Sequence, residues 1–160
     1  MDIKIRKAKK EDRKQIYTLI TSVLKKEFGL NEATYPEADL ADVTKAYGGK
    51  KDIFFVAVIG NTIIGTIAVK EDDKNTALLR RISVSPEFRG IGLGKNLIIK
   101  AIEFCQKQGY RIVNFRSTEK MEAANSLCQK NGFKIRASMD IGHTTILKLT
   151  RRLRAQKRVV

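Results

Sequence analysis

The sequence predicts a mixed α/β (α+β) layer fold, built as one domain around a single sheet. Strand-like stretches rich in β-branched residues alternate with amphipathic helical stretches, in the order βααβββαβαββ. A strand–helix–strand unit implies a right-handed parallel crossover, so we expect one parallel strand pair in an otherwise antiparallel sheet. The chain has 160 residues, 42% of them hydrophobic, which is enough for one core. We expect the domain at residues 1–150 and a basic tail at 151–160.

The first quarter of the chain predicts one strand and two helices. Residues 3–6 alternate apolar and basic side chains, as a half-buried strand does. Residues 11–28 place five apolar side chains on one helical face, and Gly29 ends that helix. Residues 31–36 are expected to form a loop, and residues 37–47 a second, short helix.

The middle of the chain predicts three successive antiparallel strands. Residues 53–59 and 62–69 are rich in β-branched and aromatic side chains, and only Gly60 and Asn61 separate them, which is typical of a hairpin. A third strand is expected at residues 77–84. It ends before Pro86, because proline cannot donate a ladder hydrogen bond.

The last third of the chain predicts two helices and three strands. Residues 95–108 form an amphipathic helix that leads into a strand at 111–116, the expected parallel neighbour of the strand at 77–84. A helix is expected at 119–130, followed by a hairpin of strands at 133–139 and 144–149.

A glycine-rich run between the third strand and the next helix is the clearest candidate binding site. Gly90, Gly92 and Gly94 alternate with apolar residues between Arg89 and Lys95. Without side chains there, backbone N–H groups at a helix start can converge on an anion, which the helix dipole also favours. The spacing matches neither the dinucleotide fingerprint nor the P-loop. The same glycines would also suit a simple turn, and the spacing alone leaves both interpretations open.

The charge of the chain favours polyanionic partners. The formal net charge is +15, which attracts nucleic acid, a phosphate-rich cofactor or an acidic protein. Residues 151–158 hold five positive charges and no negative one, as a solvated tail would. No apolar run approaches the roughly 18 residues of a membrane span, and no signal-peptide core is present, so we expect a cytoplasmic protein without membrane association. Cys105 and Cys128 are expected to be reduced thiols, and no metal site is expected.

Two motifs resemble the GNAT superfamily of acyl-CoA-dependent N-acyltransferases. Residues 80–94, R-R-I-S-V-S-P-E-F-R-G-I-G-L-G, are similar to its central strand–loop–helix motif. Residues 124–133, A-N-S-L-C-Q-K-N-G-F, are similar to its later A-x-x-L-Y-x-x-x-G-F motif. The resemblance covers residues 3–149. It implies a mostly antiparallel sheet of about seven strands, with helices on both faces and the parallel pair at the CoA site.

The resemblance also implies a mechanism, the transfer of acetyl from acetyl-CoA to a primary amine by direct attack. The amine would belong to a small molecule, a lysine side chain or a protein N-terminus. Backbone groups of the strand before the loop would pair with the pantothenate arm, as in β-augmentation, and one N–H would polarise the thioester carbonyl. The residues implied for the pantothenate arm are Ile82, Ser83 and Val84. Those implied for the pyrophosphate are Arg89, Gly90, Ile91, Gly92, Leu93, Gly94 and Lys95.

The sequence departs from the family pattern where catalytic side chains are expected. Cys128 replaces the tyrosine that usually protonates the leaving thiolate, and it is either a weaker proton donor or a buried helix residue. Leu78 stands where many relatives carry an acidic general base. Glu119 is the candidate replacement, with the turn residues Glu71, Asp72 and Asp73 as further alternatives.

Two more positions complete the candidate set. Met121 stands where many relatives carry asparagine, and Asn125, one turn later, is a candidate contact to the cofactor. His143, the only histidine, is expected in the last hairpin turn, either as a proton relay or as a surface residue.

The changed catalytic positions leave a second function open. In that alternative the chain is a catalytically degenerate CoA-binding module with a regulatory role, or one associated with RNA or the ribosome. Dimers are common among similar proteins, so a homodimer is also an open expectation, although no residue pattern specifies one.

Overall fold

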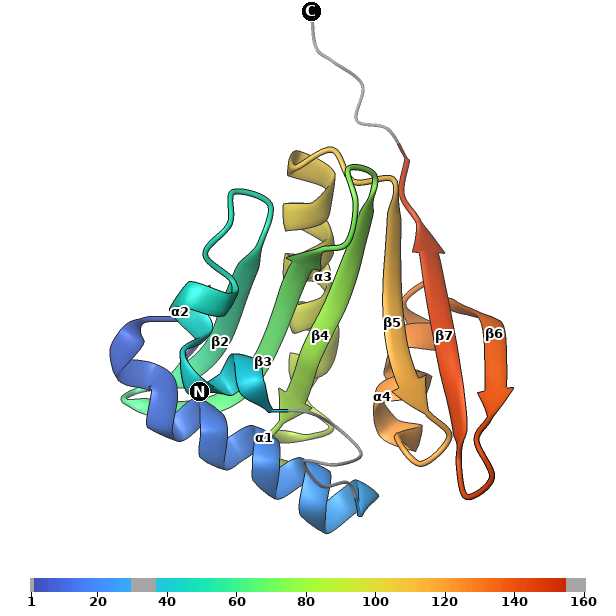
Figure 1. Cartoon of the computed structure of the whole chain (residues 1–160). Helices are drawn as coiled ribbons and strands as arrows, with labels where there is room; N and C mark the ends of the chain where they lie inside the picture. The colour runs from blue at the N-terminus through green and yellow to red at the C-terminus, as the bar shows by residue number, and fades with distance from the viewer. Residues whose placement is uncertain (1, 30–36, 155–160) are drawn as a thin grey trace, which may run out of the picture.

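The computed structural model describes residues 2–29 and 37–154. The predicted loop at 31–36 therefore lies outside the described residues. Short 3₁₀ turns flank several elements, at Lys10–Asp12, Ala38–Ala41 (η2) and Pro86–Phe88. The helices and strands (Figure 1) are β1 (Ile3–Lys7), α1 (Arg13–Phe28), α2 (Val43–Ala46), β2 (Ile53–Ile59), β3 (Thr62–Glu71), β4 (Thr76–Val84), α3 (Leu93–Lys107), β5 (Ile112–Thr118), α4 (Glu122–Lys130), β6 (Lys134–Asp140) and β7 (Thr145–Arg152).

The described strands form one sheet in the order β1-β2-β3-β4-β5-β7-β6. Neighbouring strands are antiparallel except for β4 and β5, which are joined through α3 and run parallel. The predicted mixed sheet with one parallel pair is therefore confirmed. Among the described helices, none is long and apolar enough to cross a membrane.

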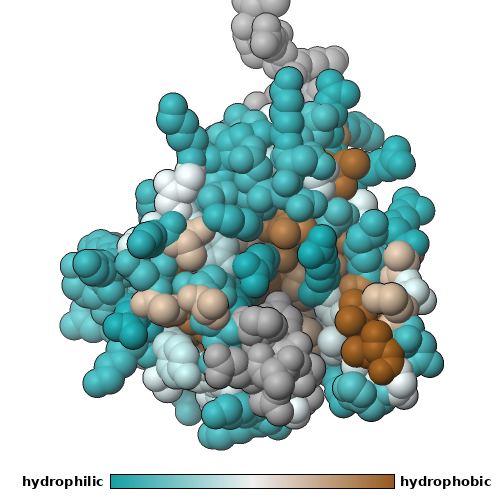
Figure 2. Space-filling view, in the orientation of Figure 1, coloured by the Kyte–Doolittle hydropathy of each residue, from teal (hydrophilic) through white to brown (hydrophobic). Residues whose placement is uncertain are grey.

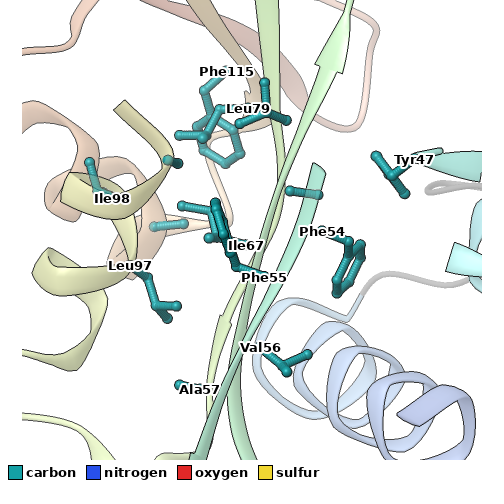
Figure 3. Packing of buried hydrophobic residues seen from close by; sticks show 14 of the residues in the cluster. Tyr47, Phe54, Phe55, Val56, Ala57, Ile67, Leu79, Leu97, Ile98 and Phe115 are labelled. Atoms are coloured by element: carbon teal, nitrogen blue, oxygen red, sulfur yellow. The ribbon is translucent and has the colours of Figure 1, made fainter. Parts of the chain in front are cut away.

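Helices cover both faces of the sheet. α1 and α2 lie on one face, and α3 and α4 on the other (Figure 1). Successive side chains of β2 point to opposite faces of the sheet. Phe54 packs edge-on against Tyr47 beside α2, and Phe55 packs edge-on against Phe104 of α3. Figure 3 shows these two layers, with Leu97 and Ile98 of α3 opposite the side of Tyr47. Alternate side chains of the central strands thus build two apolar layers around one sheet.

The sheet opens between β4 and β5. These strands pair only from Thr76 to Leu79 on β4, and they diverge toward their carboxyl ends (Figure 1). A β-bulge lies just past this point, where Arg81 and Ile82 of β4 stand opposite one residue of β3. Arg81 has a φ of 56°, unusual for a residue with a side chain. The bulge bends β4 away from β5 and leaves the edge of β4 free beside the glycine run.

Several element boundaries differ from the prediction. The helix predicted at 37–47 is divided into the turn η2 and the four-residue α2, because Asp42 adopts an extended backbone and its side chain accepts a hydrogen bond from the Lys45 N–H. α4 starts at Glu122 rather than at residue 119, because β5 continues through Thr118 and the Glu119 N–H pairs with Thr145 O.

The last strand is longer than predicted. β7 runs to Arg152, beyond the expected strand end at residue 149 and the expected domain boundary at 150. Its additional residues pair with the first residues of β5, and the Leu153 N–H donates to Arg111 O at 2.8 Å. The basic residues at 151 and 152 therefore belong to the sheet. Their backbone pairing with β5 holds them in a strand despite the repulsion between their like charges.

Candidate active site

The glycine run forms the turn from β4 into α3. Gly90 and Gly92 have φ values of 78° and 83°, and no atom lies within 4 Å of where a Cβ would stand on either. Gly92 is also the N-cap residue of α3, and it offers no side chain to the first N–H groups of that helix. A long helix therefore presents its positive end and uncapped donors at an open loop, the arrangement that suits a phosphate.

Gly94 has a different role from the other two glycines. A Cβ at this position would lie 2.7 Å from Cδ2 of Leu127 on α4. Gly94 therefore lets α3 and α4 approach closely, whereas Gly90 and Gly92 provide the left-handed turn. Gly94 also lines the cavity described below, so its predicted place at the binding site stays a prediction.

The charged side chains at the two ends of the glycine run have different surroundings. The Arg89 side chain turns back and donates from Nε and Nη2 to Val84 O, at 3.1 and 3.0 Å. It therefore contacts a carbonyl of the strand that was predicted to pair with the pantothenate arm. Lys95 is exposed on the first turn of α3.

A cavity of about 430 Å³ lies beside this turn. It is lined by residues 82–84 of β4, by the turn that leads into α3, and by side chains of α4. The structure thus brings together all the predicted cofactor-binding residues except Ile91, which is 50% exposed, and Asn125. Other helices also supply walls that the local sequence pattern did not predict, which include Val23 of α1 and Leu127 and Lys130 of α4.

Cys128 does not line this cavity. It points into the core with 0% of its surface exposed, and burial raises the pKa of its thiol to about 12. A buried thiol with such a pKa stays protonated at neutral pH and contacts no solvent. The structure therefore places Cys128 as a core residue of α4, and its catalytic role stays a prediction.

The predicted acidic residues also lie outside the cavity. Glu119 is exposed just after β5, where its backbone N–H donates to Thr145 O at 3.0 Å. The turn residues 71–73 precede β4, at the end of the strand opposite the glycine run. In the described part of the chain no carboxylate lines the cavity.

Asn125 joins α4 to the end of β5. Its Oδ1 accepts a hydrogen bond from Ser117 Oγ at 2.5 Å, and its Nδ2 donates to Thr118 O at 2.9 Å. The side chain is buried and outside the cavity lining, so it positions α4. Met121 is buried before it, and His143 is exposed in the turn between β6 and β7.

A buried ionic cluster beside the bulge was missed from the sequence. The Arg81 guanidinium forms an ion pair with Asp39 of η2, and Tyr47 Oη donates to Asp39 Oδ2 at 2.6 Å. Burial opposes ionisation of Asp39, but the hydrogen bonds from Arg81 and Tyr47 hold its pKa below the usual value. Burial raises the pKa of Tyr47 above its ordinary range. The cluster ties η2 and α2 to the strand that borders the cavity.

Known proteins are similar to this chain in sequence and in fold. The family model described as "Acetyltransferase (GNAT) family" matches residues 17–133. Two curated relatives are N-acetyltransferase family 8 member 2 of Rattus norvegicus, 37% identical over 103 residues, and N-acetylaspartate synthetase of Danio rerio, 37% identical over 99 residues. These matches cover 61% and 60% of this chain but 46% and 35% of the relatives, so the chain spans less than half of their length.

Solved structures support the fold. A GNAT acetyltransferase of Staphylococcus aureus Mu50 has a TM-score of 0.83 at 22% identity, covering 96% of this chain and 100% of that one. The PaiA N-acetyltransferase of Thermoplasma acidophilum, solved in complex with coenzyme A, has a TM-score of 0.75 at 24% identity, with the same coverages. The sheet that splits at β4, the glycine turn at α3 and the family match agree: the chain belongs to the GNAT family of acetyltransferases.

Proposed function

We propose that this chain is an N-acetyltransferase that moves the acetyl group of acetyl-CoA to a primary amine. The observation that carries the proposal is the cavity that joins the free edge of β4 to the glycine turn at the start of α3. One end of this cavity suits the phosphates of a CoA ester. At the other end, the edge of β4 has no partner strand and can pair with the amide-containing arm of that ester.

The pyrophosphate fits the start of α3. The open turn at Gly90 and Gly92 and the uncapped N–H groups of the helix supply donors, and Arg89 and Lys95 supply positive charge. Arg89 would exchange its contact with Val84 O for a contact with phosphate. That exchange frees the carbonyl for the pantothenate arm.

The pantothenate arm fits the edge of β4 at Ile82, Ser83 and Val84. β5 stops pairing with β4 after Leu79, so the edge past the bulge has no neighbouring strand among the described residues. An extended amide chain can add to such an edge through backbone hydrogen bonds. A backbone N–H of β4 would then polarise the thioester carbonyl for attack by a neutral amine.

The chemistry needs no covalent enzyme intermediate. The amine nitrogen forms a bond to the carbonyl carbon, the carbon–sulfur bond breaks, and the CoA thiolate takes up a proton as the amine loses one. No described carboxylate lines the cavity, so we propose that water relays these protons. Cys128 and Glu119 are the side chains whose catalytic role needs a direct test.

A thiol-release assay with acetyl-CoA over a panel of amines tests the proposal. The panel contains amino acids, a polyamine such as spermidine, and peptides with a free N-terminus or a lysine. We expect amine-dependent release of CoA with at least one class of acceptor. Tight binding of acetyl-CoA without release above background would instead favour a CoA-binding regulatory or RNA-associated module.

A further inference from the structure

Three cationic side chains stand in a row across the sheet, at the level where it splits. Arg80 and Arg116 are the first residues of β4 and β5 beyond the last parallel pair, Leu79 and Phe115. Lys148 of β7 pairs directly with Arg116. The row therefore crosses three strands, and the split lies between its first two members.

All three side chains lie on the face that α1 and α2 partly cover. Arg80 follows Phe54 and Ala68 in the register, and Phe54 packs against Tyr47 on that face. Leu79 and Phe115 are buried on the opposite face, so the residues that follow them point away from α3. Leu149 is also buried there, and Lys148 before it shares the face of Arg116.

The row is not neutralised within the described part of the chain. Arg80, Arg116 and Lys148 form no ion pair there; Arg80 lies within electrostatic range of Asp39, but the ion pair of that carboxylate is with Arg81. Like charges directly opposite each other on neighbouring strands destabilise a sheet. Arg116 and Lys148 are both exposed, and no described helix lies over β5, β7 and β6 on this face (Figure 1). The face is largely hydrophilic, apart from an apolar patch at its lower right (Figure 2). An anionic ligand bound here would therefore reduce the repulsion between these cations.

An unpaired hydroxyl lies on the same strand and face as Arg116. Thr118, two residues further along β5, is 8% exposed, and its Oγ1 has no hydrogen-bond partner in the described structure. Thr144, just before β7, has the same property at 3% exposure. Buried hydroxyls normally have partners, so these two groups can donate to a polar ligand at the open side of the split.

The row and most of the donor cavity lie on opposite sides of the split. The cavity is walled mainly by β4, the start of α3 and α4, with Val23 as its one lining residue from α1, whereas the row lies on the α1 and α2 face. We propose that Arg80, Arg116 and Lys148 bind the carboxylate of the acceptor, so that the acceptor is a small amino acid whose amine reaches the thioester through the split. This inference rests on the proposed N-acetyltransferase function and names its substrate class.

The chemistry of the row separates amino acids from other amines. A carboxylate can accept two hydrogen bonds from one guanidinium, and a second carboxylate would engage the remaining cation. A polyamine would be repelled by the same charges. The row therefore predicts a preference for acidic amino acids over their neutral amides, and for both over spermidine.

Steady-state kinetics with matched acceptors test the inference. The acceptors are aspartate and asparagine, glutamate and glutamine, an amino acid amide without free carboxylate, and spermidine. Arg116→Gln and Lys148→Gln should each raise the KM for the acidic acceptors about tenfold, with kcat and the KM for acetyl-CoA nearly unchanged. Arg154→Gln and Lys107→Gln change exposed residues away from the split and serve as controls. Thr118→Val should raise the same KM without changing the net charge.

The outcomes distinguish this inference from the proposed function. Acetyl transfer that prefers spermidine or the amino acid amide, or variants that leave the KM for acidic acceptors within twofold of wild type, would overturn the carboxylate site while leaving the N-acetyltransferase intact. Absence of CoA release with every acceptor would overturn the function itself.

Discussion

Replacing Cys128 with alanine tests whether its thiol takes part in catalysis. The side chain is 0% exposed and does not line the donor cavity, and its pKa is raised to about 12 by burial. A proton donor in that environment is poorly matched to neutral pH, since general acids work best with a pKa near the working pH. We therefore expect kcat to change less than about threefold, well below the hundredfold that general acid catalysis commonly supplies.

The expected cost is to stability instead. Removing a buried sulfur leaves a small cavity and costs about 1–2 kcal/mol, comparable with the loss of one or two buried methyl groups. For a domain of this size that corresponds to a fall in Tm of roughly 2–8 °C.

Cys105 provides a matched control. It is also 0% exposed, its thiol pKa is also raised to about 12, and it lies on α3, roughly 20 Å along the helix from Gly92. Thermal unfolding and thiol-release kinetics of Cys105→Ala and Cys128→Ala should give similar losses of Tm and similar kcat values. A kcat loss beyond about a hundredfold in Cys128→Ala alone, with Tm close to that of the control, would refute the structural role.

Three further predictions concern the framework around the site. Asp39→Asn leaves the Arg81 guanidinium without its buried counter-charge and should lower the free energy of unfolding by about 3–5 kcal/mol in urea titrations; a loss below 1 kcal/mol would contradict the role of the cluster. Burial raises the thiol pKa values of Cys105 and Cys128 from 9.0 to about 12. The contribution of the two protonated thiols to the free energy of unfolding is therefore fully present below pH 9 and is lost as the pH rises toward 12. Ionisation of the two thiols in the unfolded chain should lower the free energy of unfolding by about 3 kcal/mol at about pH 10. The double alanine variant should show a shallower decline of that free energy with pH. A chain that ends at Leu149 lacks the last pairs of the β5–β7 ladder and should melt at least about 5 °C lower; an unchanged Tm would show that these pairs contribute nothing.

Local sequence patterns predicted most of the fold because they encode most of its elements. The β-branched strands, the amphipathic helices and the glycines that end them follow from neighbouring residues. The parallel pair followed from the handedness of one strand–helix–strand unit. The boundaries that differ depend on residues far along the chain: β7 extends to Arg152 because β5 offers partners, and α4 starts late because Glu119 pairs with Thr145.

The site was predictable only in its local part. The glycine turn and the edge of β4 are continuous in sequence, and both line the cavity. The pair between Asp39 and Arg81 joins residues 42 positions apart, and no local pattern indicates that Arg81 occupies a bulge. The close packing of Gly94 against Leu127 was not predictable for the same reason, because Leu127 lies on another helix.

Calorimetric titration of acetyl-CoA into the wild type and into Gly92→Glu tests the central claim most directly. Gly92 has a positive φ and open space around it, so glutamate strains the turn modestly and places a negative charge beside the start of α3. We expect wild type to bind acetyl-CoA and the variant to lose binding at least a hundredfold, with circular dichroism showing the same folded state. Equal affinity in the two proteins, or no binding by wild type, would contradict the assignment of the glycine turn to the CoA pyrophosphate.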